Sequence, residues 1–292
     1  MKVLVTGATG FIGRNVAEHF SATHQVSAPA RSELNLLDSA AVKSYLERHC
    51  FDAIIHAATE RSNRAVGSAP DLLARNCRMF FNLQRNQHAF GRMIALSSGA
   101  VYGRACVPPL VTEEQFDERV PSDDYGFSKY VCAKSIRADE EIYELRLFGV
   151  FGPHEDWRVR FLSNACCRAA WDLPVIIRQN VYFDYLDVSD LARVLDHFLT
   201  GSFRYRQYNV ASGCPVDLKT LAAEVIEVSG KPLEFVVRQE GLGSEYTASN
   251  RRLIAEIPAF RFCERKESIA RLYEWYASRK AGIDLRLLRF DG

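Results

Sequence analysis

Apolar residues follow two alternating patterns over the first half of the chain. Short runs rich in valine, isoleucine and leucine have the length of buried strands, and the longer runs between them have the apolar spacing of amphipathic helices. Strands that alternate with helices at this spacing form parallel βαβ units, so the pattern predicts an α/β fold with a Rossmann-type, doubly wound parallel sheet. The predicted strands are Lys2–Thr6, Gln25–Ala28, Asp52–His56, Met93–Ser97 and Glu141–Leu147, and the predicted helices are Phe11–Phe20, Ser39–Arg48 and Pro70–Ala89.

Three glycines follow the first predicted strand directly, in the stretch VTGATGFIGRN. Ligands of a parallel sheet bind at the carboxyl ends of its strands, where a helix N-terminus attracts phosphate. Because they lack side chains, Gly7 permits the tight turn, Gly10 lets a pyrophosphate approach the backbone N–H groups, and Gly13 lets the helix pack closely. The strand–turn–helix context therefore predicts a dinucleotide site.

A tyrosine and a lysine four residues apart begin another predicted helix, in the stretch YGFSK. Tyr125 and Lys129 lie about 40° apart around the helix axis and share a face. A nearby ammonium favours the phenolate and lowers the pKa of a tyrosine. Ser98 follows the Met93–Ser97 strand, where its hydroxyl would bind a substrate oxygen. Together these three side chains predict carbonyl reduction or alcohol oxidation.

The same helix, which we expect Ser122 or Asp123 to cap, holds a second pair at the same spacing, Tyr130 and Lys134. Tyr130 follows Tyr125 by five residues and points about 140° away from it. Both tyrosines cannot face one nicotinamide. We expect Tyr125 to be the catalytic residue and Tyr130 to be a packing residue.

The composition is that of an ordinary globular protein. Of the 292 residues, 48% are hydrophobic and 25% are charged, and 37 lysines and arginines balance 36 acidic residues, so no charge excess favours nucleic acid or an acidic membrane. No apolar run reaches the ~20 residues of a membrane span. The eight cysteines include no CxxC pair, and we expect reduced, mostly buried thiols, no metal site and a cytoplasmic location.

A series of motifs extends along almost the whole chain: GATGFIG, HAAT, LSSGAVYG, YGFSK, RLFGVFGP, FDYLDVSDLA and YNVASGCPVDLKTLA. Together they resemble the extended short-chain dehydrogenase/reductase family, of the NAD-dependent epimerase/dehydratase type. The resemblance implies an NAD(P)-dependent nucleotide-sugar reductase or epimerase. It also implies Tyr125 as the general acid/base, Lys129 as the residue that tunes the tyrosine pKa and binds a ribose, and Ser98 as the partner of the substrate oxygen.

The residues after the second predicted strand favour NADP(H) over NAD(H). The stretch Val26–Arg31 has no acidic residue to bind a ribose 2′-hydroxyl. Arg31, together with Arg14, could instead clamp a 2′-phosphate. The alternative is NAD(H), with two solvated surface arginines.

Other cofactor contacts come from the resemblance. The stretch ELNLLDSAAV resembles the corresponding segment of GDP-fucose synthases and dTDP-4-dehydrorhamnose reductases, which implies that Asn35 and Leu36 border the adenine. Ala57 and Ala58 would let the pyrophosphate and ribose pass closely. The predicted cofactor contacts are Gly7, Gly10, Phe11, Ile12, Gly13, Arg14, Arg31, Asn35, Leu36, Ala57, Ala58, Tyr125 and Lys129.

The resemblance also distinguishes reactions through the two residues after Ser98. It implies an Asp-Glu pair there in dehydratases and a cysteine in GDP-fucose synthases, whereas Gly99 and Ala100 have no side chain able to move a proton. We therefore expect reduction of the 4-keto group of a nucleotide-activated deoxysugar with NADPH. A C4 epimerase with tightly bound NAD is the first alternative, and a non-catalytic dinucleotide sensor is the second.

The second half of the chain is expected to form a smaller substrate lobe. We predict a dinucleotide-binding domain of residues 1–151, to which residues 180–201 return, and a lobe of residues 152–179 and 202–292. Phe183 stands where the resemblance leads us to expect an arginine that binds the substrate diphosphate, so Arg158, Arg160 or Arg178 would take over that contact. The predicted substrate contacts are Ser98, Gly99, Asn164, Arg158 and Arg178.

Members of the family usually form homodimers through two helices, which correspond here to Pro70–Ala89 and to Lys129–Ala138 onward. Phe80, Phe81 and Leu83 would supply the apolar seam of such a dimer. The same three residues could instead pack in the core.

Overall fold

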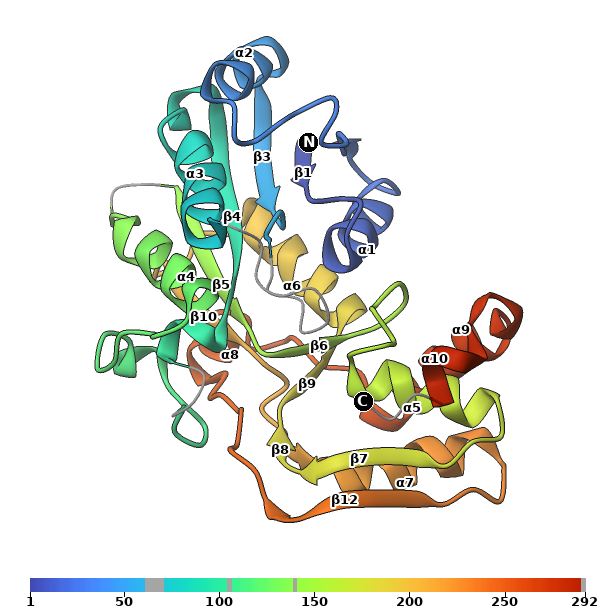
Figure 1. The fold of residues 1–292 in the computed structure, drawn as a ribbon. Coiled ribbons are helices and arrows are strands. Elements are labelled where there is room, and N and C mark those ends of the chain that lie inside the picture. Colours follow the sequence, from blue (N-terminus) through green and yellow to red (C-terminus); the bar gives the residue numbers. More distant parts are fainter. Residues whose placement is uncertain (61–70, 104–106, 139–140, 290–292) are drawn as a thin grey trace.

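The centre of the protein is a parallel sheet of six strands in the order β10-β5-β4-β3-β1-β2, as Figure 1 shows for this computed structural model. The structure describes residues 1–60, 71–103, 107–138 and 141–289. The chain leaves the middle of the sheet in opposite directions from β1 and β3, which is the doubly wound arrangement that the sequence predicts. The strands are β1 (Lys2–Thr6), β2 (Gln25–Ser27), β3 (Phe51–His56), β4 (Phe90–Ser98), β5 (Ile142–Leu147) and β10 (Gln207–Val210).

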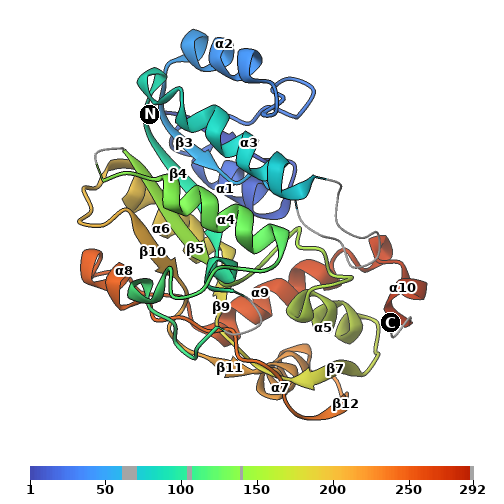
Figure 2. The ribbon, with the colours of Figure 1, turned by 60° about the vertical axis from the view of Figure 1, so that its left-hand side comes forward.

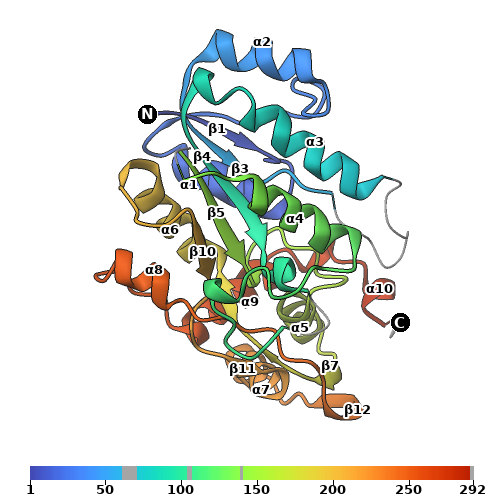
Figure 3. The ribbon, with the colours of Figure 1, turned by 90° about the vertical axis from the view of Figure 1, so that its left-hand side faces the viewer.

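Helices cover both faces of the sheet, because successive strand residues point to opposite sides. Val3 and Val5 of β1 belong to the core under α1 and α6, and Leu4 belongs to the core under α2 and α3. Figures 2 and 3 show α3 and α4 side by side on the second of these faces. The covering helices are α1 (Phe11–Phe20), α2 (Ser39–His49), α3 (Leu72–Gln84), α4 (Asp124–Ser135) and α6 (Val188–Thr200).

Most predicted elements agree with the structure to within a few residues, but one helix is shorter. The pattern predicts Pro70–Ala89, whereas α3 is followed by a separate 3-10 helix, η1 (Gln87–Ala89). Asn86 donates a side-chain hydrogen bond to the carbonyl of Asn82 at 2.8 Å. Such a bond competes with the helical pattern and favours a break. Pro70 lies outside the described residues.

A smaller lobe with a core of its own lies beyond the carboxyl ends of the sheet strands (Figure 1). Its main strands, β7 and β12, pair in parallel, and α5, α7 and α9 pack together beside them. These elements are α5 (Phe161–Ala170), β7 (Val175–Asn180), α7 (Leu218–Ser229), β12 (Phe235–Leu242) and α9 (Arg265–Ala277). The remaining short elements belong to either part of the protein: η2 (Gly99–Tyr102), η3 (Glu113–Gln115), β6 (Gly149–Phe151), β8 (Tyr182–Phe183), β9 (Tyr185–Asp187), β11 (Val216–Asp217), α8 (Arg251–Glu256), η4 (Lys280–Gly282) and α10 (Leu285–Arg289).

The division between the two parts differs from the predicted one. The sequence predicts that residues 202–292 belong to the lobe, but β10 is the sixth strand of the sheet. Leu253 of α8 and Phe260 after it also pack in the core of the sheet domain. The reason is that β5 would otherwise be an exposed sheet edge, and an edge strand is stabilised by a partner.

The predicted dimer seam is largely unavailable for an interface. Phe80 and Leu83 are buried in the core between α3 and the sheet, and Phe81 packs partly against the same core. Core packing, the second possibility for these residues, is therefore what the structure has. A homodimer through α3 and α4 stays a prediction that needs other contacts.

The cysteines are more exposed than expected. Of the seven described cysteines, all free thiols, Cys166 and Cys167 are buried, while Cys50 and Cys214 are exposed. The expectation that most thiols are buried is therefore wrong for the described residues; Cys106 lies outside them. In the described part of the chain, no helix is long and apolar enough to cross a membrane, and no group of three or more His, Cys, Asp or Glu could hold a metal ion.

A cluster of aromatic rings packs β10, the sixth strand of the sheet, against α6. The ring of Phe198, fully buried on α6, stacks on Phe203 with centroids 4.0 Å apart and meets Tyr208 of β10 edge to face. We expect Phe198→Ala to lower the free energy of unfolding by about 3–5 kcal/mol, because it removes these contacts and leaves a cavity. Urea unfolding followed by circular dichroism measures the change. Phe235→Ala, at a partly exposed position on β12, is the control and should change the value by less than about 1 kcal/mol.

Candidate active site

The glycine-rich turn after β1 is packed too tightly for side chains at two positions. Gly7 has a φ of +70°, and a Cβ there would lie 2.6 Å from the backbone nitrogen of Ala58. A Cβ on Gly13 would lie 2.3 Å from the carbonyl oxygen of Gly7. Both contacts are with backbone atoms, which cannot move aside, so the turn, α1 and the end of β3 fit together only with glycine. The Ala57–Ala58 backbone therefore packs directly against the turn. The predicted approach of a pyrophosphate and ribose to these two alanines stays a prediction.

The start of α1 is the part of this turn that remains open. Gly10 is its N-cap residue and, having no side chain, provides no side-chain cap hydrogen bond. A Cβ on Gly10 would meet only the Gly7 oxygen, at 3.3 Å. The first N–H groups of a helix bind anions when no side chain caps them. The residues present thus fit the pyrophosphate of a dinucleotide at the point where the strand order reverses.

Charged residues line the edge of this region near the end of β2. Arg31 is 66% exposed and lies 3.7 Å from Glu60. Glu60 is held mainly by Arg75, which donates two hydrogen bonds of 2.6 Å and keeps the pKa of the carboxyl below its usual value. Arg14 pairs with Glu18 one turn further along α1, at 3.0 Å. Arg31 is therefore an exposed and loosely paired cation, whereas Arg14 already has a close partner.

The two residues predicted to border an adenine lie in different surroundings. The side chain of Leu36 is buried in the core under α2 and α3, and its carbonyl accepts a hydrogen bond from Asn82 at 2.8 Å. Asn35 is exposed, and its side chain accepts from the backbone N–H of Leu37. Their contact with an adenine stays a prediction, and the exposed Asn35 offers the more accessible side chain of the two.

The segments that carry the three predicted catalytic residues pack against each other. Ser98 ends β4 and caps η2 by accepting a hydrogen bond from Ala100 N–H at 3.2 Å. Asp123 caps α4 by accepting from Gly126 N–H at 2.8 Å. A Cβ on Gly126 would lie 2.8 Å from the carbonyl oxygen of Ala100. Glycine next to Tyr125 thus lets the helix of the tyrosine approach the turn of the serine.

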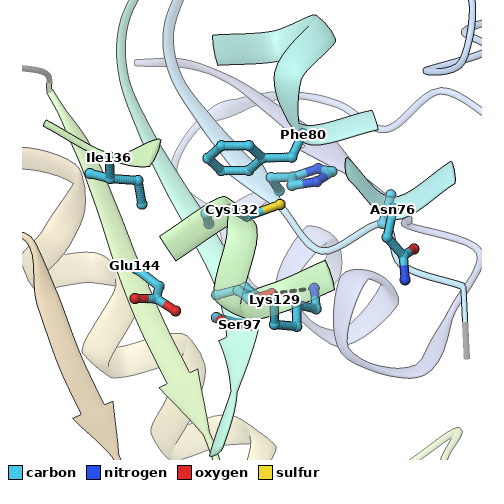
Figure 4. Close-up of a pocket in the computed structure, with 11 residues that line it drawn as sticks. Asn76, Phe80, Ser97, Lys129, Cys132, Ile136 and Glu144 are labelled. Carbon is cyan, nitrogen blue, oxygen red and sulfur yellow. Dashed lines mark hydrogen bonds between the residues drawn. The ribbon is translucent and has the colours of Figure 1, made fainter. Parts of the chain in front are cut away.

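Lys129 is buried beneath Tyr125. Its ammonium donates a hydrogen bond of 3.2 Å to the carbonyl of Leu96 and lies 5.8 Å from the centre of the Tyr125 ring. Figure 4 shows the lysine directed along a small cavity between α3, α4 and the sheet. The ammonium thus lies close to the Tyr125 ring. Its predicted effect on the protonation of the phenol stays a prediction.

His56 ends β3 on the other side of this cavity. Its Nδ1 atom is hydrogen-bonded to the Thr6 hydroxyl at 2.8 Å, and its side chain is buried. Burial, and to a smaller extent the positive charge of Lys129, lower the pKa of His56 to about 3. The imidazole is therefore neutral at physiological pH and joins β1 to β3.

Two buried oxygens that the sequence analysis does not identify face the same cavity (Figure 4). Among the described residues, neither Ser97 Oγ nor Glu144 Oε1 has a hydrogen-bond partner, although both side chains are more than nine-tenths buried. The other oxygen of Glu144 accepts a hydrogen bond of 3.0 Å from Arg146 Nε and forms an ion pair of 2.9 Å with Arg146 Nη2. The cavity has a volume of about 20 Å³. This is room for about one water molecule.

The second tyrosine–lysine pair faces another direction. Tyr130 donates a hydrogen bond to one oxygen of Asp117, and Lys134 donates to the other at 2.7 Å. The hydrogen bond to the Asp117 carboxylate stabilises the protonated phenol, so it raises the pKa of Tyr130. This shift is opposite to the one that a proton donor near neutral pH needs. The Tyr130 ring also packs against Phe116 and Phe127, with centroids 5.3 and 6.2 Å apart, and its packing role stays a prediction.

Tyr246 contacts the region of Ser98 and was not predicted. Its hydroxyl lies 3.4 Å from Ser98 Oγ. A Cβ on Gly99 would lie 2.7 Å from this hydroxyl and 2.5 Å from the Phe148 ring. A side chain at position 99 would therefore clash with Phe148 and Tyr246, and only glycine fits there. No periodic pattern or known motif marks Tyr246, which stands far from the other site residues in sequence.

The predicted substrate residues of the lobe are mostly engaged locally. Arg158 forms two hydrogen bonds with Asp156, of 2.7 and 2.8 Å. Asn164 donates to the carbonyl of Trp157 at 3.0 Å, and Arg178 is exposed on β7. A contact of any of these residues, or of Arg160 near Glu155, with a substrate stays a prediction.

Comparisons with known proteins agree with this geometry. The model of the NAD dependent epimerase/dehydratase family matches residues 3–211. The chain is 27% identical over 287 residues to an ADP-L-glycero-D-manno-heptose-6-epimerase of Cupriavidus pinatubonensis, covering 83% of this chain and 84% of the relative. Its fold resembles a GDP-L-fucose synthetase of Naegleria fowleri bound to NADP, with a TM-score of 0.80 and 17% identity over 96% and 94% of the two chains. It also resembles the UDP-glucose 4-epimerase of Thermus thermophilus in complex with NAD, with a TM-score of 0.77 and 22% identity over 94% and 99%.

The buried His56 predicts a pH-dependent stability. Above pH 6.5 the imidazole is neutral in both states, but as the pH falls below 6.5 the unfolded chain binds a proton that the folded protein, with a pKa of about 3, does not. The free energy of unfolding should therefore fall by up to about 1.4 kcal/mol per pH unit. His56→Asn should lack this loss, so its stability relative to the wild type should rise as the pH is lowered from 7 to 4.5.

Urea unfolding of both proteins at several pH values measures this difference. Burial raises the pKa of Asp184 to about 6, which changes stability in the opposite sense, but this effect is common to both proteins and cancels. His88→Gln, at an exposed position, is the control. A His56→Asn difference that does not vary with pH would contradict the prediction.

Proposed function

The chain belongs to the NAD dependent epimerase/dehydratase family, and we propose that it reduces the 4-keto group of a nucleotide-activated deoxysugar with NADPH. Members of this family are NAD(P)-dependent enzymes, as the motifs predicted. The observation that carries the proposal is the packing of the Ser98 turn against the helix of Tyr125, with the Lys129 ammonium buried beneath the phenol. A binding protein without chemistry has no need for these three side chains together.

Each residue of the trio has a separate role in the proposed reaction. When bound, the dinucleotide supplies the hydride that the carbonyl carbon receives. Ser98 donates a hydrogen bond to the carbonyl oxygen, and Tyr125 transfers its phenolic proton to that oxygen as negative charge develops there. The Lys129 ammonium stabilises the phenolate that remains.

The residues after Ser98 support reaction at one sugar carbon. Gly99 and Ala100 have no group that removes a second proton, and the Phe148 ring and the Tyr246 hydroxyl leave no space for a side chain at position 99. Elimination of water requires an additional acid or base close to the reacting carbons. Simple hydride transfer requires only the trio.

The proposed preference for NADP(H) rests on Arg31. The arginine follows β2, is 66% exposed and lies 3.7 Å from Glu60, which Arg75 already neutralises. A guanidinium in this state can bind a 2′-phosphate with two charge-assisted hydrogen bonds without losing a strong partner.

Epimerisation with retained NAD is the second candidate, because the relative from Cupriavidus pinatubonensis is an epimerase of an ADP-linked sugar. The two reactions differ in their use of the cofactor. Incubation with candidate 4-ketosugar nucleotides, followed at the nicotinamide absorbance band, distinguishes them. Stoichiometric consumption of NADPH supports reduction, product formation without consumption supports epimerisation, and cofactor binding without any turnover would support a sensor.

We expect Tyr125→Phe to lower turnover about 100-fold or more, because the variant keeps the ring but loses the proton. Steady-state NADPH oxidation with the accepted ketosugar measures the rate. Tyr130→Phe is the matched control, since it removes a phenolic proton from the same helix at the same spacing from a lysine and should retain the wild-type rate. Full activity of Tyr125→Phe would rule out this assignment.

We expect Arg31→Ala to raise the KM for NADPH about tenfold or more and to leave the KM for NADH unchanged, because a charge-assisted hydrogen bond contributes about 1.5–3 kcal/mol. Kinetics with both cofactors measure the ratio. Arg48→Ala, which removes an exposed arginine at the far end of α2, is the control. Equal effects on both cofactors would contradict 2′-phosphate recognition.

A further inference from the structure

Tyr246, which lies shortly after the lobe strand β12, contacts Ser98, the serine of the proposed catalytic trio. The Tyr246 hydroxyl lies 3.4 Å from Ser98 Oγ, although 148 residues separate the two in sequence. Tyr246 follows β12 and is 8% exposed. A contact over this separation forms only when the lobe and the sheet domain are both folded.

The position of the phenol is fixed on several sides. The backbone N–H of Tyr246 donates to Tyr182 at 3.0 Å, and its carbonyl accepts from Asp184 at 3.3 Å. Its ring packs against Phe148 and Phe183, with centroid distances of 4.9 and 6.0 Å. The hydroxyl is therefore held beside Ser98 by the backbone and by packing, and not by a flexible side chain alone.

The hydrogen-bonding capacity of Ser98 gives this contact a direction. A serine hydroxyl has one proton to donate and two sites that accept. The N–H of Ala100 occupies one accepting site, at 3.2 Å. If the Tyr246 hydroxyl donates to the second accepting site of Ser98, both accepting sites of the serine are occupied. The serine proton is then free to donate to the substrate oxygen. If Ser98 instead donated to Tyr246, it could not donate to a carbonyl oxygen, which only accepts.

We propose that Tyr246 is a positioning residue that fixes the Ser98 hydroxyl as a hydrogen-bond donor toward the substrate oxygen. The inference rests on the proposed ketosugar reduction for the nature of that oxygen. It also explains Gly99, because a Cβ there would lie 2.7 Å from the Tyr246 hydroxyl and would displace it. The glycine and the tyrosine are thus two parts of one arrangement.

A double-mutant cycle tests the proposal with the 4-ketosugar nucleotide that the wild type reduces. Tyr246→Phe should lower kcat/KM for this substrate about fivefold to tenfold, the effect of one lost hydrogen bond, and should leave the KM for NADPH unchanged. Ser98→Ala should lower it further. The double variant should be no slower than Ser98→Ala within about twofold, because Tyr246 acts only through the serine.

Two results would overturn the proposal. One is a double variant whose loss equals the product of the two single losses, which would mean that Tyr246 acts independently of Ser98. The other is a loss of the same size in Tyr182→Phe, the matched control for removal of a nearby phenol, since Tyr182 is an exposed residue of β8. Unchanged thermal unfolding of Tyr246→Phe separates the expected effect from misfolding.

A neutron structure of the deuterated protein tests the same inference without activity. The deuteron of Tyr246 should point to Ser98 Oγ, and a Ser98 deuteron that points to Tyr246 would overturn the proposal. If the wild type reduces no ketosugar, the proposed function fails while the neutron result still decides the direction of this hydrogen bond. The two failures are thereby distinguishable.

Discussion

The buried ammonium of Lys129 is the constraint around which the site is arranged. A charge out of contact with water costs several kcal/mol unless polar groups surround it. Here the Lys129 ammonium donates a hydrogen bond to the Leu96 carbonyl, and Ser97 and Glu144 face the same small cavity. The same charge helps to keep His56 neutral and lies beneath the ring of Tyr125. Polar side chains of β3, β4 and β5 (His56, Ser97 and Glu144) thus line the same cavity as Lys129.

The parts of the site that depend on neighbouring residues could be predicted from the sequence. The doubly wound fold follows from alternating strand and helix patterns, and the glycine turn and the Tyr125–Lys129 face follow from spacing within single elements. Each of these features is local, so periodicity and steric requirements determine it. The pairing of Arg158 with Asp156 is local too, and the spacing of these two charges could have indicated it.

Long-range contacts account for what the sequence did not predict. The approach of Tyr246 to Ser98 depends on how the lobe packs on the sheet domain, and no pattern in the sequence reports that packing. The sequence left open whether Phe80 packs in the core or at a dimer interface, because this depends on which face of α3 meets the sheet. A signal for Glu144 did exist, since two charges alternate within the apolar strand IYELRL, and charged residues are rarely buried unless they are paired.

The sheet domain and the lobe are each built from several separate segments of the chain, which limits how the two can be separated. The backbone passes from the sheet domain to the lobe and back repeatedly, with β10 and α8 in one part and α7, β12 and α9 in the other. Neither part is a continuous stretch of the gene. Proteolytic nicking at one connection would leave both halves joined by the remaining connections, and recombination between related genes could exchange a whole lobe only through several simultaneous crossovers.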